Sequence, residues 1–286
     1  MIYRVANRYF SVEGQSARSM IEALGSFEGF QALGDTPPGE LVMRFETGHD
    51  LDVVLGKELY SLEVEGVISI FERYADGYQF RLVTRATGDE FIFQKADGED
   101  IYRANDTAEP GIFRFALWMA LNMALAPHKV TAIHSSTIVW NDRAVMFLGE
   151  SGTGKSTQTK LWLKHIENSW LLNDDSPFLA VEDGVCVAYG SPWSGKTPCY
   201  KDKRVPVAAI VRLSQAPHNK LRRLPTIEAF GALFPSAPPA LAYDPDYTDM
   251  TCELISDVIG AAPLYHFECL PDRDAAMTVF NELFGG

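Results

Sequence analysis

The chain has 286 residues, of which 47% are hydrophobic and 22% charged, with 22 glycines and 16 prolines. At about 150 residues per domain this predicts a folded protein of roughly two domains, and it excludes disordered, collagen-like and low-complexity classes. Lysine and arginine number 25 against 38 aspartate and glutamate residues, and the resulting net charge of −13 disfavours nucleic acids and anionic membrane surfaces as partners.

The first hundred residues have the pattern of strands separated by turns. Turn signals recur, as in Ala75-Asp76-Gly77, and residues 16–24 are the exception with the pattern of a short helix. Apolar and polar residues alternate, as in strands with one buried face, over 2–12, 40–46, 67–74, 78–84 and 90–94. We therefore predict an antiparallel β-rich domain over residues 1–108. It contains no catalytic constellation, and its role is left open.

From residue 109 onward the pattern changes to mixed α/β. The apolar stretch 115–127 predicts a buried helix over about 110–126, since it is shorter than the roughly 20 residues that cross a bilayer. Further strands are predicted over 130–139, 143–148, 170–173, 185–189 and 205–213, and further helices over about 155–168, 226–234 and 273–284. The fold class expected for residues 109–286 is mixed α/β, and for the whole chain α+β.

The N-terminus and the cysteines bear on the compartment. The first ten residues lack the apolar segment of a signal peptide. The four cysteines show neither CxxC nor Cys/His metal spacing, which predicts free thiols in a reducing compartment. We therefore expect a cytoplasmic protein.

The most informative motif is a glycine-rich phosphate-binding loop. It follows an apolar strand, precedes an amphipathic helix and matches G-x-x-x-x-G-K-S with one further threonine: Gly149, Glu150, Ser151, Gly152, Thr153, Gly154, Lys155, Ser156, Thr157. Glycines let the backbone N–H groups turn inward toward phosphate oxygens, and the helix N-terminus favours the anion. Lys155 would neutralise the β- and γ-phosphates, and the Ser156 hydroxyl would ligate Mg²⁺. A chance match is the alternative, which the strand and helix on either side disfavour.

A pair of acidic residues follows one helix and one strand later. Asp174 and Asp175 end the apolar run 170–172, so they should lie at the strand end beside the loop. There a carboxylate can hold a metal ion or take a proton from an attacking hydroxyl. The alternative is that the pair only begins the turn completed by Ser176 and Pro177. Many phosphate-loop GTPases and motor ATPases place their second acidic motif farther along the chain.

Four segments in this order carry a family resemblance: Ile133-His134-Ser135-Ser136, the phosphate loop, Leu172-Asn173-Asp174-Asp175 and Tyr189-Gly190-Ser191-Pro192-Trp193. Over about residues 128–285 the chain resembles the catalytic domain of the HPr serine kinase/phosphorylase family, as a divergent relative. That domain shares the nucleotide-site fold of phosphoenolpyruvate carboxykinase. The resemblance does not extend to the N-terminal half.

The resemblance implies roles for individual residues. Residues 149–157 would bind ATP, Ser156 and Asp174 would help to hold Mg²⁺, and Asp175 would be the general base. His134 occupies the position of the family histidine ahead of the loop and would assist the acidic pair. The alternative for His134 is a histidine satisfied within the core.

The segment after residue 189 differs from that of authentic HPr kinases, which carry a glutamate where this chain has residues 190–196. In this respect the chain resembles relatives associated with peptide modification or small-molecule phosphorylation. Candidate substrate contacts are Ser191, Trp193, Lys196 and Arg204. Lys196 or Arg204 could balance the γ-phosphate charge and Trp193 could shape the acceptor pocket, the alternatives being solvated cations and a core tryptophan.

Three functions are compatible with these residues. The first is an ATP- and Mg²⁺-dependent kinase that phosphorylates a serine-type hydroxyl of an amino acid, peptide or protein. The second is a non-catalytic ATP-binding sensor or scaffold, which would need metal chelation but no base. The third is a GTPase-type hydrolase, disfavoured by the absence of an Asn-Lys-x-Asp motif. The acceptor, the reverse reaction and the oligomeric state stay open: related kinases form homo-oligomers, but no segment here identifies an interface.

Overall fold

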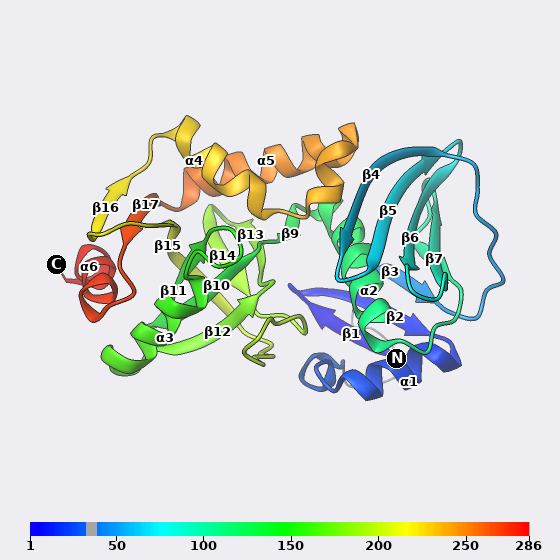
Figure 1. Ribbon diagram of the computed structural model, residues 1–286, viewed down its shortest axis with the longest axis horizontal. Helices are drawn as coiled ribbons and strands as arrows, with labels where there is room; N and C mark the ends of the chain where they lie inside the picture. The colour runs from blue at the N-terminus through cyan, green and yellow to red at the C-terminus, as the bar shows by residue number, and fades with distance from the viewer. Residues whose placement is uncertain (33–38, 286) are drawn as a thin grey trace. The chain divides into compact units, whose positions relative to one another are not determined.

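The computed structural model describes residues 1–32 and 39–285 (Figure 1). Within them the chain forms two compact units, one of residues 1–128 with 240–248, the other of 129–239 with 249 onward. The predicted ranges 1–108 and 109–286 also include residues 33–38 and 286, which lie outside the described part. The division at His128 and Lys129 differs from the predicted one, because the helix at 110–125 and the distant segment 240–248 pack in the first unit.

The first unit contains an eight-stranded sheet and two α-helices. Its elements are β1 (Ile2–Val5), β2 (Arg8–Glu13), α1 (Gln15–Leu24), β3 (Leu41–Glu46), β4 (Lys57–Val64), β5 (Val67–Tyr74), β6 (Gly77–Thr84), β7 (Glu90–Ala96), β8 (Ile101–Ala104) and α2 (Pro110–Leu125). The strand order is β1-β2-β3-β8-β7-β6-β5-β4. Most neighbours are antiparallel as predicted, but β3 runs parallel to both β2 and β8. A crossover containing α1 joins β2 to β3, and such a connection makes a parallel pair.

Helix α2 is the buried helix that the apolar stretch predicts. Pro110 opens it, where a missing N–H costs nothing, and ten of its side chains are buried. No helix among the described residues is both long and apolar enough to cross a membrane.

The second unit is built around a nine-stranded mixed sheet. Its elements are β9 (Val130–Ala132), β10 (Ser135–Trp140), β11 (Arg143–Leu148), α3 (Lys155–His165), β12 (Trp170–Asp175), β13 (Phe178–Glu182), β14 (Val185–Tyr189), β15 (Arg204–Gln215), β16 (Lys220–Arg223), α4 (Thr226–Leu233), α5 (Pro245–Ala261), β17 (Leu264–Cys269) and α6 (Arg273–Phe284). The first residues of α5, 245–248, belong to the first unit. The order is β12-β10-β11-β15-β14-β13-β9, with β17 beside β15 and β16 beside β17. The mixed α/β class predicted from the sequence is confirmed.

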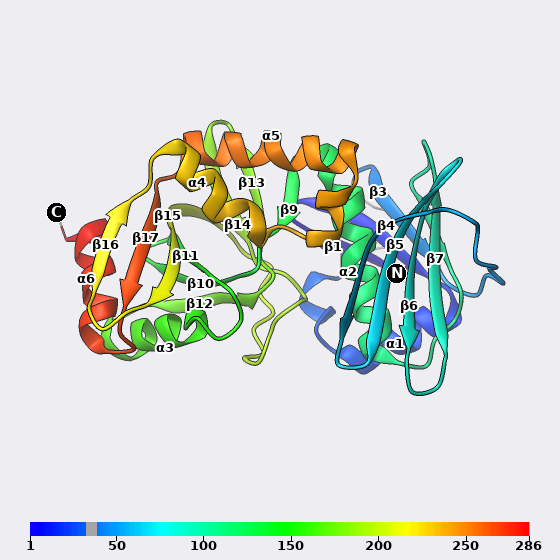
Figure 2. The same cartoon turned by 45° about the horizontal axis from the view of Figure 1, so that its top comes forward.

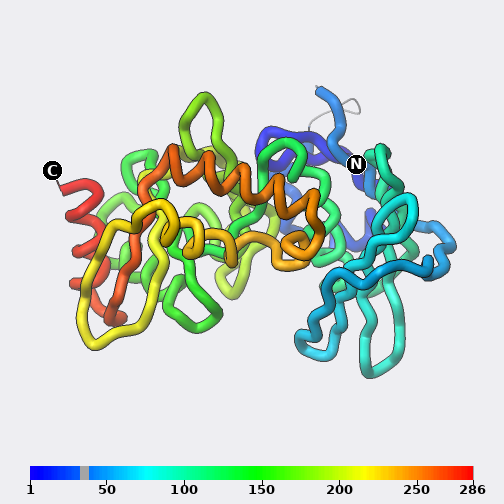
Figure 3. Tube along the Cα trace, turned by 90° about the horizontal axis from the view of Figure 1, so that it is seen from above, coloured from blue at the N-terminus to red at the C-terminus, as the bar shows by residue number. Residues whose placement is uncertain are grey.

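Helices cover both faces of this sheet (Figure 2). Alternate residues of β11 show why: Ala144, Met146 and Leu148 pack with α4 and α5, while Val145 and Phe147 pack with α3 and α6. Helices α4 and α5 run side by side (Figure 3). The two apolar layers fix the end of β11, and thereby the start of the loop that follows it.

Two predicted strands are each divided in the structure. A turn at Ala6 and Asn7, both with positive φ, separates β1 from β2. Residues 133 and 134 separate β9 from β10, which places His134 in a connection. The sequence patterns also do not predict β4, β8, β13, β16, β17 or α5.

Candidate nucleotide and catalytic site

The glycine-rich loop lies between β11 and α3, in the strand–loop–helix context that its sequence predicts. Its three glycines Gly149, Gly152 and Gly154 have φ of 147°, 84° and 111°, a region that favours glycine. Gly154 is the N-cap of α3, so the first N–H groups of the helix face the loop. The loop is therefore built to present donors to an anion.

Lys155 reaches back over this loop. Its Nζ donates hydrogen bonds to the carbonyl oxygens of Gly149 at 2.8 Å and Glu150 at 3.2 Å. Burial lowers the pKa of Lys155, opposed by the charges of Asp175 and Asp174 and reinforced by that of Arg212. The ammonium thus bonds to the loop backbone and interacts electrostatically with both carboxylates.

Asp174 is buried and is held by two hydroxyl groups. Its Oδ1 accepts hydrogen bonds from Ser156 Oγ at 2.9 Å and Ser136 Oγ at 2.6 Å. Ser136 also lies 3.0 Å from the hydroxyl of Thr159 on α3. These contacts join the loop helix to β10 and β12, and the strand register explains them, because Ser136 pairs directly with Asp174.

Asp175 stands in a different environment from its neighbour. Its side chain is 40% exposed, and Oδ1 lies 3.8 Å from His134 Nε2. The amide oxygen of Asn173 accepts hydrogen bonds from the backbone N–H of Asp175 and of Ser176, at 3.0 and 2.9 Å, which orients the end of β12. Burial lowers the pKa of His134; the positive charge of Lys155 adds to this effect and Asp175 opposes it.

Residues 191–193, which follow β14, form hydrogen bonds with the residues on either side of the acidic pair. Asn173 donates to the carbonyl oxygen of Trp193 at 2.9 Å, and the Ser191 hydroxyl donates to that of Ser176 at 2.6 Å. Ser191 and Trp193 are both buried, and Trp193 packs on Phe178. Ser191 and Trp193 therefore help to position the end of β12, which carries the acidic pair.

The two predicted cations have different surroundings. Lys196 is exposed, one residue beyond Gly195, whose N–H donates to the carbonyl oxygen of Asp174 at 3.1 Å. Arg204 instead binds Glu182 at 2.8 Å and does not join the other predicted residues. Of the loop side chains, Glu150, Ser151 and Thr157 are exposed, and the Thr153 hydroxyl donates to the carbonyl oxygen of Glu150 at 2.8 Å.

Arg212 is a further cation of the site, and no motif in the sequence indicates it. It lies on β15 opposite Leu148, the last residue before the loop. Its Nη1 donates to the carbonyl oxygen of Ala232 at 3.2 Å, and its Nη2 lies 4.0 Å from Glu150 Oε1. In the sequence Arg212 is only an arginine near the end of an apolar strand. Its place beside the loop follows from the pairing of β15 with β11.

The oxygen donors at the loop fit a hard divalent cation. Asp174 and Ser156 offer carboxylate and hydroxyl oxygens, which Mg²⁺ prefers. No group of three or more His, Cys, Asp or Glu side chains among the described residues could hold a metal ion. This donor set fits Mg²⁺ shared with nucleotide phosphates, because Mg²⁺ commonly uses one or two protein carboxylates in that way.

Comparison with known proteins leaves the family undecided. No family model and no curated protein matches the sequence. Among solved structures, the chain is similar to the Hpr(Ser) kinase/phosphatase from Coxiella burnetii, with 12% identity over 52% of this chain and 85% of that chain and a TM-score of 0.31. A likeness of this level leaves the function to be argued from the site.

Proposed function

We propose that this protein is an ATP- and Mg²⁺-dependent kinase that transfers the γ-phosphate to a serine-type hydroxyl. The observation that carries the proposal is the pair of carboxylates beside the loop. Asp174 is buried and hydrogen-bonded to the loop residue Ser156, while Asp175 is partly exposed and lies near His134. Carboxylates in such different environments suit different chemical roles.

The transfer follows from these roles. The oxygen of the acceptor hydroxyl attacks the γ-phosphorus, and an O–P bond forms. The bond between that phosphorus and the β–γ bridging oxygen breaks, and its electron pair leaves with ADP. Asp175 takes the hydroxyl proton, and His134, whose Nε2 lies 3.8 Å from Oδ1, would assist that carboxylate.

The cations of the site would stabilise the charge on the transferring group. Lys155 and Arg212 approach the loop from α3 and β15, and such charge stabilisation is the main contribution of a protein to phosphoryl transfer. Asp174 and Ser156 would hold Mg²⁺, which supplies further neutralisation of phosphate charge when bound. The sequence resemblance to HPr kinase-like catalytic domains supports the same assignment.

A non-catalytic ATP sensor is the main alternative. A sensor requires the loop and a metal ligand, and Asp174 with Ser156 would suffice for it. The second carboxylate, partly exposed and 3.8 Å from an imidazole, has no function in such a protein. It therefore favours the kinase.

The acceptor would carry a hydroxyl group on an amino acid, a peptide or a protein. In the segment beside the acidic pair, Lys196 is exposed and could contact the acceptor, whereas Ser191 and Trp193 are buried. We further propose that the protein acts in the cytoplasm.

The test is γ-phosphate transfer from labelled ATP with Mg²⁺ to free serine, small hydroxyl compounds and serine-containing peptides. We expect a labelled product with the native chain and its loss with Asp175→Asn. Asp183→Asn is the matched control, since Asp183 is an exposed residue of the β13–β14 turn with φ of 49° that asparagine also adopts.

The results separate the functions. Tight ATP binding without transfer to any acceptor would favour the sensor. Transfer that survives Asp175→Asn would contradict the proposed base. A clear preference for GTP in the same binding assay would instead favour the hydrolase.

A further inference from the structure

Strand β4 forms one edge of the eight-stranded sheet. At the opposite edge β1 is partly covered, because Tyr3 forms a bridge with Gln31, and Ala32 N–H donates to the carbonyl oxygen of Ile2 at 2.9 Å. Within the described residues, the backbone of β4 has no comparable bonds besides those to β5. An uncovered edge is a template for pairing with another strand.

Apolar side chains are exposed along this edge. Two residues of β4 are among the large hydrophobic residues exposed in the described part, Leu62 and Val64. Leu62 is 45% and Val64 56% exposed, on the same face as Tyr60, which packs against Tyr243 with ring centroids 5.0 Å apart. The edge strand therefore presents apolar side chains on one face, and exposed apolar surface of this kind favours an interaction.

The backbone of β4 offers its free groups at defined positions. Val64 and Val67 flank a two-residue turn, Glu65 and Gly66, both with positive φ. In such a hairpin these flanking residues form a hydrogen-bonded pair, and bonded pairs then alternate along the strands. The N–H and C=O groups of Ser61 and Glu63 therefore point outward.

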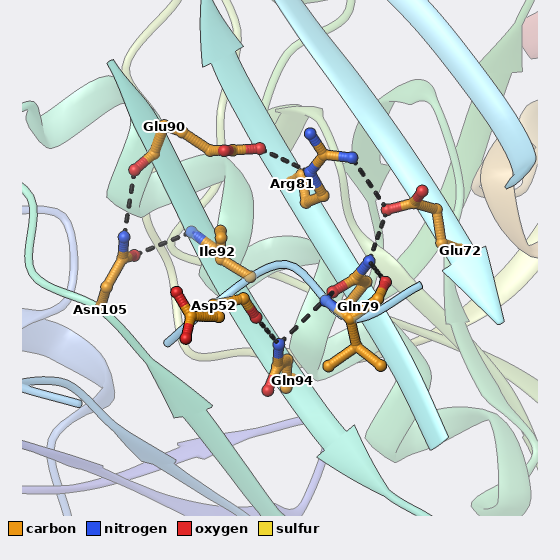
Figure 4. Close-up of polar contacts among 9 residues, drawn as sticks. Asp52, Glu72, Gln79, Arg81, Glu90, Ile92, Gln94 and Asn105 are labelled. Carbon is orange, nitrogen blue, oxygen red and sulfur yellow. Dashed lines mark hydrogen bonds and ion pairs between the residues drawn. The ribbon is translucent and has the colours of Figure 1, made fainter. Parts of the chain in front are cut away.

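Side-chain contacts join the strands next to this edge. Arg81 on β6 forms ion pairs with Glu72 on β5 and Glu90 on β7, at 3.3 and 2.5 Å (Figure 4). The buried amide of Gln79 donates to Glu72 at 2.8 Å. These contacts join the three strands next to β4, so a partner strand would meet a preformed surface.

We propose that two copies of this chain pair through β4, antiparallel about a two-fold axis at Leu62. In this register Leu62 opposes Leu62 of the other copy, and Tyr60 opposes its Val64. Ser61 pairs with Glu63 of the other copy, which joins the outward-pointing backbone groups. The two β4 strands would then lie at the centre of a sixteen-stranded sheet. Together they would carry six neighbouring apolar side chains on one face.

The apolar positions of β4 suit self-pairing, because residues 60, 62 and 64 are spaced symmetrically about Leu62. A two-fold interface must be self-complementary, and Tyr60, Leu62 and Val64 are centred on the axis. The one charge among residues 60–64, Glu63, is bound by Arg85 of its own chain, with hydrogen bonds of 2.8 and 2.6 Å. No unpaired like charges therefore meet at the centre of the interface.

Sedimentation of the full chain over a wide concentration range tests the proposal. We expect the mass to rise with concentration from 31.8 kDa to about twice that value. The dimer fraction should also rise with salt, because each copy carries a net charge of −13 and salt screens that repulsion. Circular dichroism would check the fold of each variant below.

Leu62→Lys places two like charges across the axis and should abolish the dimer. Ser61→Pro removes an outward-pointing N–H group while leaving the hydrogen bonds between β4 and β5 intact. It should also abolish the dimer. Val185→Lys is the matched control, since Val185 is also 45% exposed but lies on β14, and it should leave the dimer unchanged.

The register has its own test. Leu62 and its symmetry mate form a non-hydrogen-bonded pair, whose Cα spacing of about 4.5 Å permits a disulfide. Treated with diamide, Leu62→Cys should form a covalent dimer and Val64→Cys should not. The proposal is overturned if the native chain stays at 31.8 kDa throughout, as it would if β4 served a different protein partner. It is also overturned if Leu62→Lys still dimerises.

Discussion

The hydroxyl of Ser156 donates a 2.9 Å hydrogen bond to Asp174, joining the first turn of α3 to the end of β12. This contact holds the glycine-rich loop and the acidic pair in one arrangement. It also places the two residues that would share Mg²⁺ within direct reach of each other. The predictions below follow from this geometry and its surroundings.

Lys155→Ala should weaken ATP binding in the presence of Mg²⁺ by roughly 10- to 100-fold, because a charge-assisted contact to phosphate contributes about 1.5–3 kcal/mol. Isothermal titration calorimetry measures the change. Lys160→Ala is the control, because Lys160 is exposed on the same helix. Equal ATP affinities of the two variants would contradict the placement of Lys155 over the phosphates.

Ser136→Ala should lower the free energy of unfolding by about 2 kcal/mol, because it removes a 2.6 Å hydrogen bond to the buried carboxylate of Asp174. Urea denaturation measures this value. Ser256→Ala, at an exposed position of α5, should change it by less than about 0.5 kcal/mol. If both variants are equally stable, Ser136 does not stabilise the buried carboxylate.

The pH dependence of stability should include a contribution from His134. Its folded-state pKa is lowered, chiefly by burial, so the unfolded chain binds more protons as the pH falls from about 7 through the ordinary histidine value near 6.5. The free energy of unfolding should therefore decrease over this range, and less steeply in His134→Gln. Urea denaturation at several pH values compares the slopes. Identical slopes would show that His134 has no lowered pKa.

Gly190→Ala should lower the free energy of unfolding by about 2–4 kcal/mol, because the added Cβ would collide with the backbone carbonyl oxygen of Lys201. Gly231→Ala is the contrasting change. Gly231 lies within α4 with no neighbouring atom in reach of a Cβ, so alanine should stabilise the chain by up to about 1 kcal/mol. Thermal unfolding of both variants measures the opposite signs, and a neutral Gly190→Ala would contradict the close approach.

Several elements of the fold can be predicted closely from local sequence patterns. The ranges predicted for 67–74, 143–148 and 185–189 coincide with β5, β11 and β14, because a half-buried or fully buried strand imposes its periodicity on the sequence. Strand β4 was not predicted, because most of its residues are exposed and the burial of one face therefore does not constrain its sequence. Helix α5 was also not predicted.

For the candidate site, local sequence was sufficient to identify the loop and the acidic pair. The glycines and Lys155 belong to one continuous motif, and Asp174 and Asp175 follow from the length of one helix and one strand. These residues lie close together in the chain, so a local sequence pattern can identify them.

The other residues that join them depend on how the strands pair. Ser136 reaches Asp174 because β10 pairs with β12, and Arg212 reaches the loop because β15 lies parallel to β11. The same structure binds Arg204 to Glu182 and buries Trp193. Strand pairing brings together residues that are distant in the chain, and its register depends on the packing of whole sheets, which no local pattern encodes.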